Sequence, residues 1–259
     1  MVGGTGGGEE EKEGRGLNKP TPPPTGISLS AHRLSHRWPD APSNSFGPLD
    51  FEVPAGSLCL LLGPNGCGKT SLLLRLAGLT RGPGQLRLDG VDCTPKTFKK
   101  LGSALGFVWA NPDDGLLLPV VWEDVALGPC NDGLPRPRAK ALALHWLERL
   151  GLGALWQSPL RSLSLGQRQA VALAGVLARN PRMLLLDEPL SHLDGGMRLR
   201  VLQTLAECGA TCIAATHEPA FWKQHWGGRC RELFMGRGIR GGGGGGEEGY
   251  APPGPTPPR

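Results

Sequence analysis

Residues 63–70 (GPNGCGKT) have the types and spacing needed to hold a phosphate group. They fit the pattern G-x-x-x-x-G-K-[ST], follow the apolar run 58–62 and precede a helix-like segment. Glycines let backbone N–H groups crowd around phosphate oxygens, and a helix N-terminus adds positive potential there. We expect Lys69 to reach the β- and γ-phosphates of a nucleotide and the Thr70 hydroxyl to ligate Mg²⁺. For this motif alone, the alternative is a glycine turn with a chance lysine, since the chain has 41 glycines.

Two adjacent carboxylates, Asp187 and Glu188, form the second candidate for chemistry because they end the apolar run 183–186. An apolar strand that ends in acids places them at the carboxyl edge of a parallel sheet, where ligands bind. Asp187 is expected to hold Mg²⁺ through water, and Glu188 to polarise a water for in-line attack on the γ-phosphate. The alternative is a strand end capped by solvated acids.

Three further short motifs accompany these two, at 164–167, 191–194 and 216–218. The first, Ser-Leu-Gly-Gln, stands where a helical pattern begins, and alone it would be a helix cap. The third contains His217, which alone would be a structural histidine. All five motifs in this order are hard to assign to chance.

Predicted strands and helices alternate along the chain and place the motifs at strand ends and helix starts. Strands are predicted at 47–53, 58–62, 85–88, 105–109, 183–186 and 211–215, and helices at 71–79, 138–150 and 167–178. This alternation implies an α/β fold with a parallel sheet and helices on its faces. Between residues 111 and 166 helical patterns dominate.

Composition divides the 259-residue chain into a central region and two tails. Residues 1–26 and 241–259 are rich in glycine and proline and are expected to be disordered, because they bury too little apolar surface to offset ordering entropy. The region 27–240 is long enough for a substantial core. The net charge of +5 is scattered rather than gathered on one face, so we expect no nucleic-acid partner.

Cysteine usage and hydropathy bear on the setting of the protein. The chain has seven cysteines at irregular spacings, none in a C-x-x-C motif, which favours a reducing compartment over a disulfide framework. The longest apolar runs are strand-length, well short of the ~20 residues of a membrane helix. The N-terminus also lacks the apolar centre of a signal peptide.

Taken together, the motifs resemble those of ATP-binding-cassette (ABC) ATPases over about residues 27–240. The resemblance implies a P-loop core with a parallel sheet, an antiparallel β subdomain and a helical subdomain at about 111–166. It implies ATP and Mg²⁺ as cofactors. Residues 163–167 resemble the signature motif of this family. The resemblance also implies a second ABC ATPase chain as partner, because in this family the phosphate loop of one chain faces the signature motif of the other across two ATP molecules.

The resemblance also assigns roles to individual residues. Glu188 and His217 take the catalytic positions, with His217 as the switch histidine that senses the γ-phosphate. Thr70 and Asp187 take the metal positions. Trp38 stands where the family has an aromatic that stacks on adenine, its alternative being a buried or interface tryptophan. The nucleotide-contacting set is Trp38, Gly63, Pro64, Asn65, Gly66, Cys67, Gly68, Lys69, Thr70, Ser71, Ser164, Gly166, Gln167 and Asp194.

Residues 106–114 and 119–128 carry a narrower resemblance, to the Q-loop region of cobalt/nickel and vitamin (energy-coupling-factor-type) ATPases and of a related plant and algal plastid subunit. Such chains dock on separate membrane subunits. Three positions depart from the pattern. Ala110 stands where the family has a glutamine that ligates Mg²⁺ and couples to the transporter, Leu165 replaces a signature glycine, and Ala170 replaces an arginine.

Two hypotheses follow. In the first, the chain is the ATP-hydrolysing subunit of an ABC transporter for a small solute, such as a transition-metal ion or a vitamin. It would then work with an integral membrane transport subunit, as a peripheral membrane protein that faces the cytosol or, in a chloroplast, the stroma. In the second, it is a soluble assembly or scaffold ATPase of the iron–sulfur-cluster kind, which Ala110 favours. A DNA-repair ATPase would need a long coiled-coil or zinc-binding insert, and the chain has neither.

Overall fold

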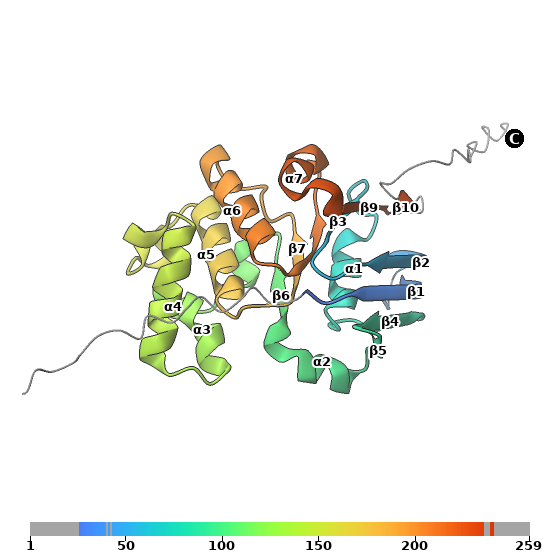
Figure 1. Ribbon diagram of the computed structural model, residues 1–259, viewed down its shortest axis with the longest axis horizontal. Coiled ribbons are helices and arrows are strands. Elements are labelled where there is room, and N and C mark those ends of the chain that lie inside the picture. The colour runs from blue at the N-terminus through green and yellow to red at the C-terminus, as the bar shows by residue number, and fades with distance from the viewer. Residues whose placement is uncertain (1–25, 40, 42, 236–238, 241–259) are drawn as a thin grey trace, which may run out of the picture.

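The protein consists of two β-sheets with helices around them (Figure 1). This computed structural model describes residues 26–39, 41, 43–235 and 239–240. The strands are β1 (Leu29–His36), β2 (Phe46–Val53), β3 (Leu58–Leu62), β4 (Gln85–Leu88), β5 (Val91–Asp92), β6 (Leu105–Val108), β7 (Met183–Asp187), β8 (Thr211–Ala215), β9 (Cys230–Phe234) and β10 (Ile239–Arg240). The α-helices are α1 (Lys69–Leu76), α2 (Pro95–Leu101), α3 (Val121–Asn131), α4 (Arg136–Arg149), α5 (Leu165–Leu177), α6 (Gly195–Glu207) and α7 (Pro219–Trp226). Short 3₁₀ helices are η1 (Gly102–Ala104), η2 (Pro112–Asp114), η3 (Gly153–Leu155), η4 (Leu160–Ser162) and η5 (Gly227–Arg229).

The larger sheet of the described region has six strands in the order β10-β9-β3-β8-β7-β6. Strands β9, β3, β8, β7 and β6 pair in parallel, and β10 pairs antiparallel to β9. Parallel pairing requires crossover connections, which the helices supply. The structure therefore confirms the predicted parallel sheet.

Side chains of the central strands alternate between two hydrophobic cores. In β7, Leu184 and Leu186 pack on the face covered by α3, α4, α5, α6 and α7. Met183 and Leu185 pack on the other face, against α1 and the second sheet. This is the two-residue period of a strand that is buried on both sides. As a consequence, α1 and α5 lie on opposite faces of the parallel sheet, and Figure 1 shows them on opposite sides of β7.

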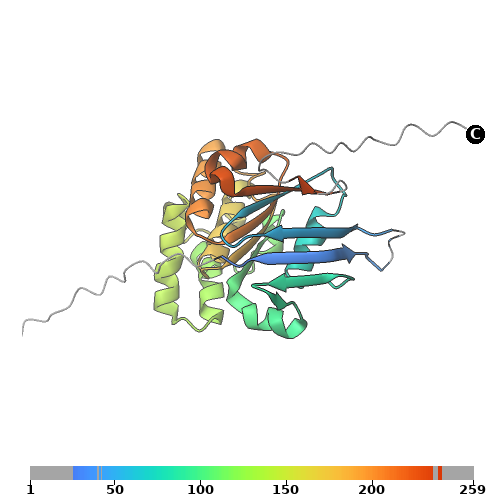
Figure 2. The same ribbon diagram turned by 45° about the vertical axis from the view of Figure 1, so that its right-hand side comes forward.

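The second sheet is antiparallel, with the order β2-β1-β4-β5 among the described residues, as expected for the antiparallel β subdomain. Figure 2 shows β1, β2 and β4 side by side, on the side of the molecule away from α3 and α4. Strand β1 was not among the predicted strands.

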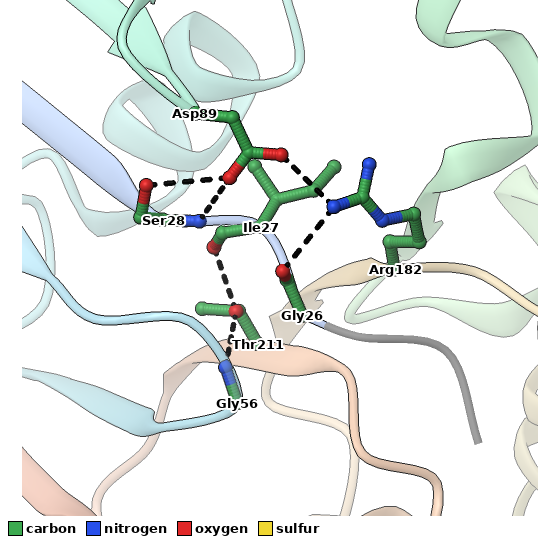
Figure 3. A network of polar contacts seen from close by, with 7 residues as sticks. All are labelled: Gly26, Ile27, Ser28, Gly56, Asp89, Arg182 and Thr211. Atoms are coloured by element: carbon green, nitrogen blue, oxygen red, sulfur yellow. Dashed lines mark hydrogen bonds and ion pairs between the residues drawn. The ribbon is translucent and has the colours of Figure 1, made fainter.

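A network of polar contacts ties the start of β1 to the parallel sheet (Figure 3). Asp89 accepts hydrogen bonds from the Ser28 backbone N–H (2.9 Å) and from Arg182 Nη2 (2.9 Å). The Thr211 hydroxyl, at the start of β8, donates to the Ile27 carbonyl (2.7 Å). The antiparallel sheet is therefore anchored where the parallel strands begin, at the edge opposite their carboxyl ends.

The helical group consists of α3, α4 and α5, which pack on one another. Helix α5 begins at Leu165 and runs to Leu177, so it extends beyond the region 111–166 in which helical patterns were expected to dominate. Within the described residues, no helix is both long enough and apolar enough to cross a membrane. The seven cysteines are free thiols. The predicted tails at 1–26 and 241–259 lie outside the described residues, apart from Gly26.

Candidate functional site

The predicted phosphate loop connects β3 to α1, at the carboxyl edge of the parallel sheet. Gly68 is the N-cap of α1 and has φ +95°, in the left-handed region that favours glycine. A Cβ at this position would also collide with the Ser45 carbonyl oxygen. Residues 64–66 are exposed at the tip of the loop. The loop therefore presents its backbone to solvent next to the N-terminus of a helix, which is the arrangement that binds anions.

Lys69 is the first residue of α1 and is 8% exposed. Its Nζ donates to the carbonyl oxygens of Gly63 (2.8 Å) and Pro64 (3.3 Å). These bonds compensate the burial of the ammonium group and hold a positive charge directly under the loop. A phosphate bound by the loop would be close to that charge.

Thr70 and Asp187 bring the loop and β7 together. The Thr70 hydroxyl donates to Asp187 Oδ2 at 2.7 Å. Burial raises the pKa of Asp187, while the hydrogen bond from Thr70 and the charge of Lys69 act in the opposite direction. A buried carboxylate beside a hydroxyl is a pair of hard oxygen donors, which suits Mg²⁺.

These two oxygens fit the way Mg²⁺ is usually held, by one or two protein ligands together with substrate phosphates and water. In the described part of the chain, no group of three or more His, Cys, Asp or Glu side chains forms a separate metal cluster. When bound, the ion would neutralise charge on the transferring phosphate.

Glu188 and His217 also meet at this edge, where the Glu188 Oε1 lies 3.2 Å from the His217 Nε2. Glu188 has φ +44°, and its backbone N–H donates to the Ala215 carbonyl at the end of β8 (3.1 Å). Burial raises the pKa of Glu188, and the nearby His217 and Lys69 partly offset that effect. A carboxylate with a raised pKa is a better general base near neutral pH than an ordinary glutamate. The sequence motif places both residues at this edge, but nothing in it indicates their contact.

Trp38 lies beside the first turn of α1. Its indole Nε1 donates to the Ser71 hydroxyl (3.2 Å), and the His36 ring packs against it edge-on at a centroid distance of 4.8 Å. The Trp38 residue is 42% exposed. The indole is therefore fixed in place and open to solvent, so it can stack on a planar ring.

The signature residues lie at the start of α5. The Ser164 hydroxyl accepts from the Gln167 backbone N–H (3.2 Å), and Gln167 Oε1 accepts from the Ser164 backbone N–H (2.9 Å). This reciprocal pair is a capping box. In this structure the Ser164 and Gln167 side chains therefore cap α5, which is the alternative role that the sequence allowed for this motif. A Cβ on Gly166 would collide with the His192 carbonyl, so glycine lets α5 approach the 190–193 turn. Asp194 caps α6 by accepting from the Met197 N–H (2.8 Å).

The predicted residues therefore fall into two groups. Trp38, Ser71, the loop 63–70 and the residues 187, 188 and 217 come together at one edge. Across the described residues, no hydrogen bond or ion pair joins Ser164, Gly166, Gln167 or Asp194 to that group, and α5 lies on the other face of the sheet from α1.

Two residues near the site escaped sequence analysis. Gln169 is fully buried on α5, and its Nε2 donates to the Trp109 carbonyl (3.1 Å), next to Ala110. Arg198 on α6 contacts the 190–193 turn and the segment that contains His217. Gln169 and Arg198 bond to backbone carbonyls or to a residue far along the chain. Neither the spacing nor the periodicity of the sequence indicates such contacts.

Comparison with known proteins adds a family and a set of relatives. A protein-family model described as ABC transporter matches residues 46–191. A putative ABC transporter ATP-binding protein of Streptomyces avermitilis is 38% identical over 208 residues, covering 78% of this chain and 79% of the relative. The energy-coupling factor transporter ATP-binding protein EcfA of Methanosphaera stadtmanae is 35% identical over 196 residues, covering 73% of this chain and 70% of the relative.

Solved structures show the same fold. CbiO1 from Clostridium perfringens, described as part of the ABC transporter complex cbiONQ, superposes with a TM-score of 0.68 at 28% identity, covering 80% of this chain and 84% of that one. A dimeric ATP-binding cassette, MJ0796 bound to ADP and Pi, superposes with a TM-score of 0.71, covering 80% of this chain and 94% of that one. At 21% identity the second likeness concerns the fold alone.

Proposed function

The chain belongs to the ABC transporter family of ATP-binding proteins, and from this we propose that Lys69, Thr70, Asp187, Glu188 and His217 carry out its ATP hydrolysis. The protein is an ATPase whose hydrolysis powers transport. The observation that carries the assignment of residues is the convergence of the phosphate loop, the Thr70–Asp187 bond and the Glu188–His217 contact at one sheet edge.

In the proposed mechanism, the loop and Lys69 hold the β- and γ-phosphates of ATP, and Thr70 and Asp187 would hold Mg²⁺. The Glu188 carboxylate accepts a proton from a water molecule whose oxygen attacks the γ-phosphorus. The bond between the γ-phosphorus and the bridging oxygen breaks, and that oxygen leaves with the electron pair as part of ADP. His217 holds Glu188 in position and contacts the γ-phosphate. Trp38 stacks on the adenine ring.

A substitution series tests this assignment. Glu188→Gln removes the proton acceptor but keeps the shape of the side chain, so we expect ATP binding to persist and hydrolysis to fall roughly 10²- to 10⁴-fold. Lys69→Ala removes phosphate contacts, so we expect ATP binding itself to weaken. Equilibrium binding and phosphate release measured on the same preparations separate the two effects. If Glu188→Gln hydrolyses ATP like the parent, the general base has been assigned wrongly.

The working site is proposed to form between two chains. Helix α5 and helix α1, which follows the phosphate loop, pack on opposite faces of one sheet, so within one chain the start of α5 does not face the loop. A second copy or a related ABC ATPase chain would supply Ser164, Gly166, Gln167 and Asp194 to the ATP held by the first.

The transported solute is proposed to be small, such as a transition-metal ion or a vitamin, since the relatives include EcfA and a CbiO protein. The alternative of an assembly ATPase is not favoured, because the relatives above are named as transporter components. A separate integral membrane subunit would carry the solute, and this chain would be peripheral on the cytosolic face or on the stromal face in a chloroplast. Affinity purification from separated native membranes should recover a protein with several membrane spans. Recovery of non-membrane partners alone would overturn this part of the proposal.

A further inference from the structure

Arg198, in the first turn of α6, contacts two segments that both lead to the site. Its Nε donates to the carbonyl oxygens of Leu190 (3.0 Å) and Leu193 (3.1 Å), in the turn that follows β7. Its Nη1 donates to Glu218 Oε2 at 2.7 Å. The Arg198 side chain is 25% exposed and that of Glu218 is 54% exposed, so the two bonds to backbone carbonyls are better shielded from water than the ion pair.

Each of these segments is joined closely to one member of the catalytic pair. Ser191, in the turn, donates its hydroxyl (2.9 Å) and its backbone N–H (3.2 Å) to the Glu188 carbonyl. Glu218 directly follows His217, and its N–H donates to the Thr216 hydroxyl (3.1 Å). A shift of either segment would therefore change the 3.2 Å contact between Glu188 and His217.

The same turn also touches the signature helix. The His192 carbonyl lies against Gly166, which is the reason that only glycine fits there. Arg198 thus holds a turn that contacts the start of α5 on one side and supports Glu188 on the other. In the proposed dimer, the start of α5 is the part that faces the partner's ATP.

We propose that Arg198 is a positioning residue for ATP hydrolysis, which locks the 190–193 turn and the 216–218 segment into one unit. It acts through Glu188 and His217 and does not touch ATP itself. A guanidinium group can donate to two carbonyls and a carboxylate at once because its donors are fixed in a planar fork, whereas an ammonium group is a single point donor. The proposal rests on the function proposed above.

The test compares four variants of the full chain, namely Arg198→Met, Arg198→Lys, Glu218→Gln and the double variant Arg198→Met/Glu218→Gln. Misplacing the base by a fraction of an ångström should lower kcat of Arg198→Met roughly 10- to 100-fold, while KM for ATP changes by about twofold or less. Arg198→Lys should recover part of the loss. Because Arg198→Met already removes the contact with Glu218, the double variant should be no slower than Arg198→Met.

Arg200→Met is the matched control, since it makes the same change at an exposed position on the same helix. It should keep the parental kcat. Thermal unfolding of each variant shows whether it is folded. If Arg198→Met does not fold, kcat of Arg198→Lys and kcat of Glu218→Gln test the proposal in its place.

Three results would overturn the proposal: an unchanged kcat for Arg198→Met, a loss confined to KM, or losses that multiply in the double variant. Glu188→Gln in the same assay distinguishes a failure of the proposed function from a failure of the role proposed for Arg198. A parent that fails to hydrolyse ATP, or a fully active Glu188→Gln, removes the proposed function itself. An active parent with an inactive Glu188→Gln and a fully active Arg198→Met removes only the role of Arg198.

Discussion

At the scale of single residues, Ala110 stands where the family resemblance has a glutamine that ligates Mg²⁺, so the proposed metal site would have one oxygen donor fewer. Its methyl group cannot ligate, and the neighbouring Trp109 carbonyl already accepts a hydrogen bond from Gln169. We expect Ala110→Gln to lower the Mg²⁺ concentration needed for half-maximal hydrolysis by about tenfold, the equivalent of ~1.4 kcal/mol. Titrating Mg²⁺ at saturating ATP measures this change.

The control for this prediction is Ala110→Leu, which adds bulk at the same position without an oxygen. It should leave the Mg²⁺ midpoint where it is in the parent. An equal shift in the two variants would mean that packing, rather than ligation, causes the change.

Sequence predicts those residues of the site whose partners follow from motif order. The bond between Thr70 and Asp187 is of this kind, because a phosphate loop and an acid-tipped strand meet at the same sheet edge. Motif order does not predict three other features: the contact of Glu188 with His217, the left-handed backbone of Glu188 and the bonds of Arg198. They depend on how separate loops settle against each other after the sheet has formed.

At the scale of elements, apolar runs predict the central parallel strands β3, β7 and β8 well because these strands are buried on both faces. The parallel strand β9, which is only partly buried, was not predicted. The range 58–62 was predicted without error, and 183–186 falls one residue short of the end of β7. Strand β1 escaped because polar residues interrupt its apolar positions, and because its partners β2 and β4 are antiparallel strands from elsewhere in the chain.

Two helices whose bounds were not predicted begin with or contain residues that disfavour helix, although α3 lies in the region 111–166 where helical patterns were expected to dominate. Helix α6 starts with Gly195 and Gly196, and α3 carries Pro129 inside it. Tertiary packing outweighs this local cost. Val201 and Leu205 of α6 and Val125 of α3 are buried in the core on the same face of the sheet. The Asp194 cap adds a favourable start to α6.

At the scale of the whole molecule, the opposite placement of α1 and α5 leads to a prediction about pairs of chains. Ser164→Asp keeps an N-cap residue on α5 but places a negative charge where the partner's γ-phosphate is expected. Lys69→Ala damages only the phosphate loop. Each variant alone should be nearly inactive. In an equal mixture with random pairing, about half of the dimers are mixed, and each mixed dimer has one complete site of two. The mixture should therefore recover about a quarter of the parental rate.

Phosphate release from the mixture measures this recovery. The matched control mixes Lys69→Ala with Glu188→Gln, two lesions on the same half of the site. That mixture should stay inactive, since no pairing brings together an intact loop and an intact base. If the Ser164→Asp mixture is no faster than its components, the site does not form between two chains.

The two-core alternation along β7 also determines where this chain can change in length. Removing one residue from within Met183–Asp187 would exchange the faces of the residues on one side of the deletion, moving leucines between cores of different shape. The same deletion would draw Asp187 and Glu188 back from the sheet edge. A residue added to a surface loop, such as the one between α3 and α4, would change neither core. We therefore expect insertions and deletions to be tolerated between the elements and rejected within the central strands.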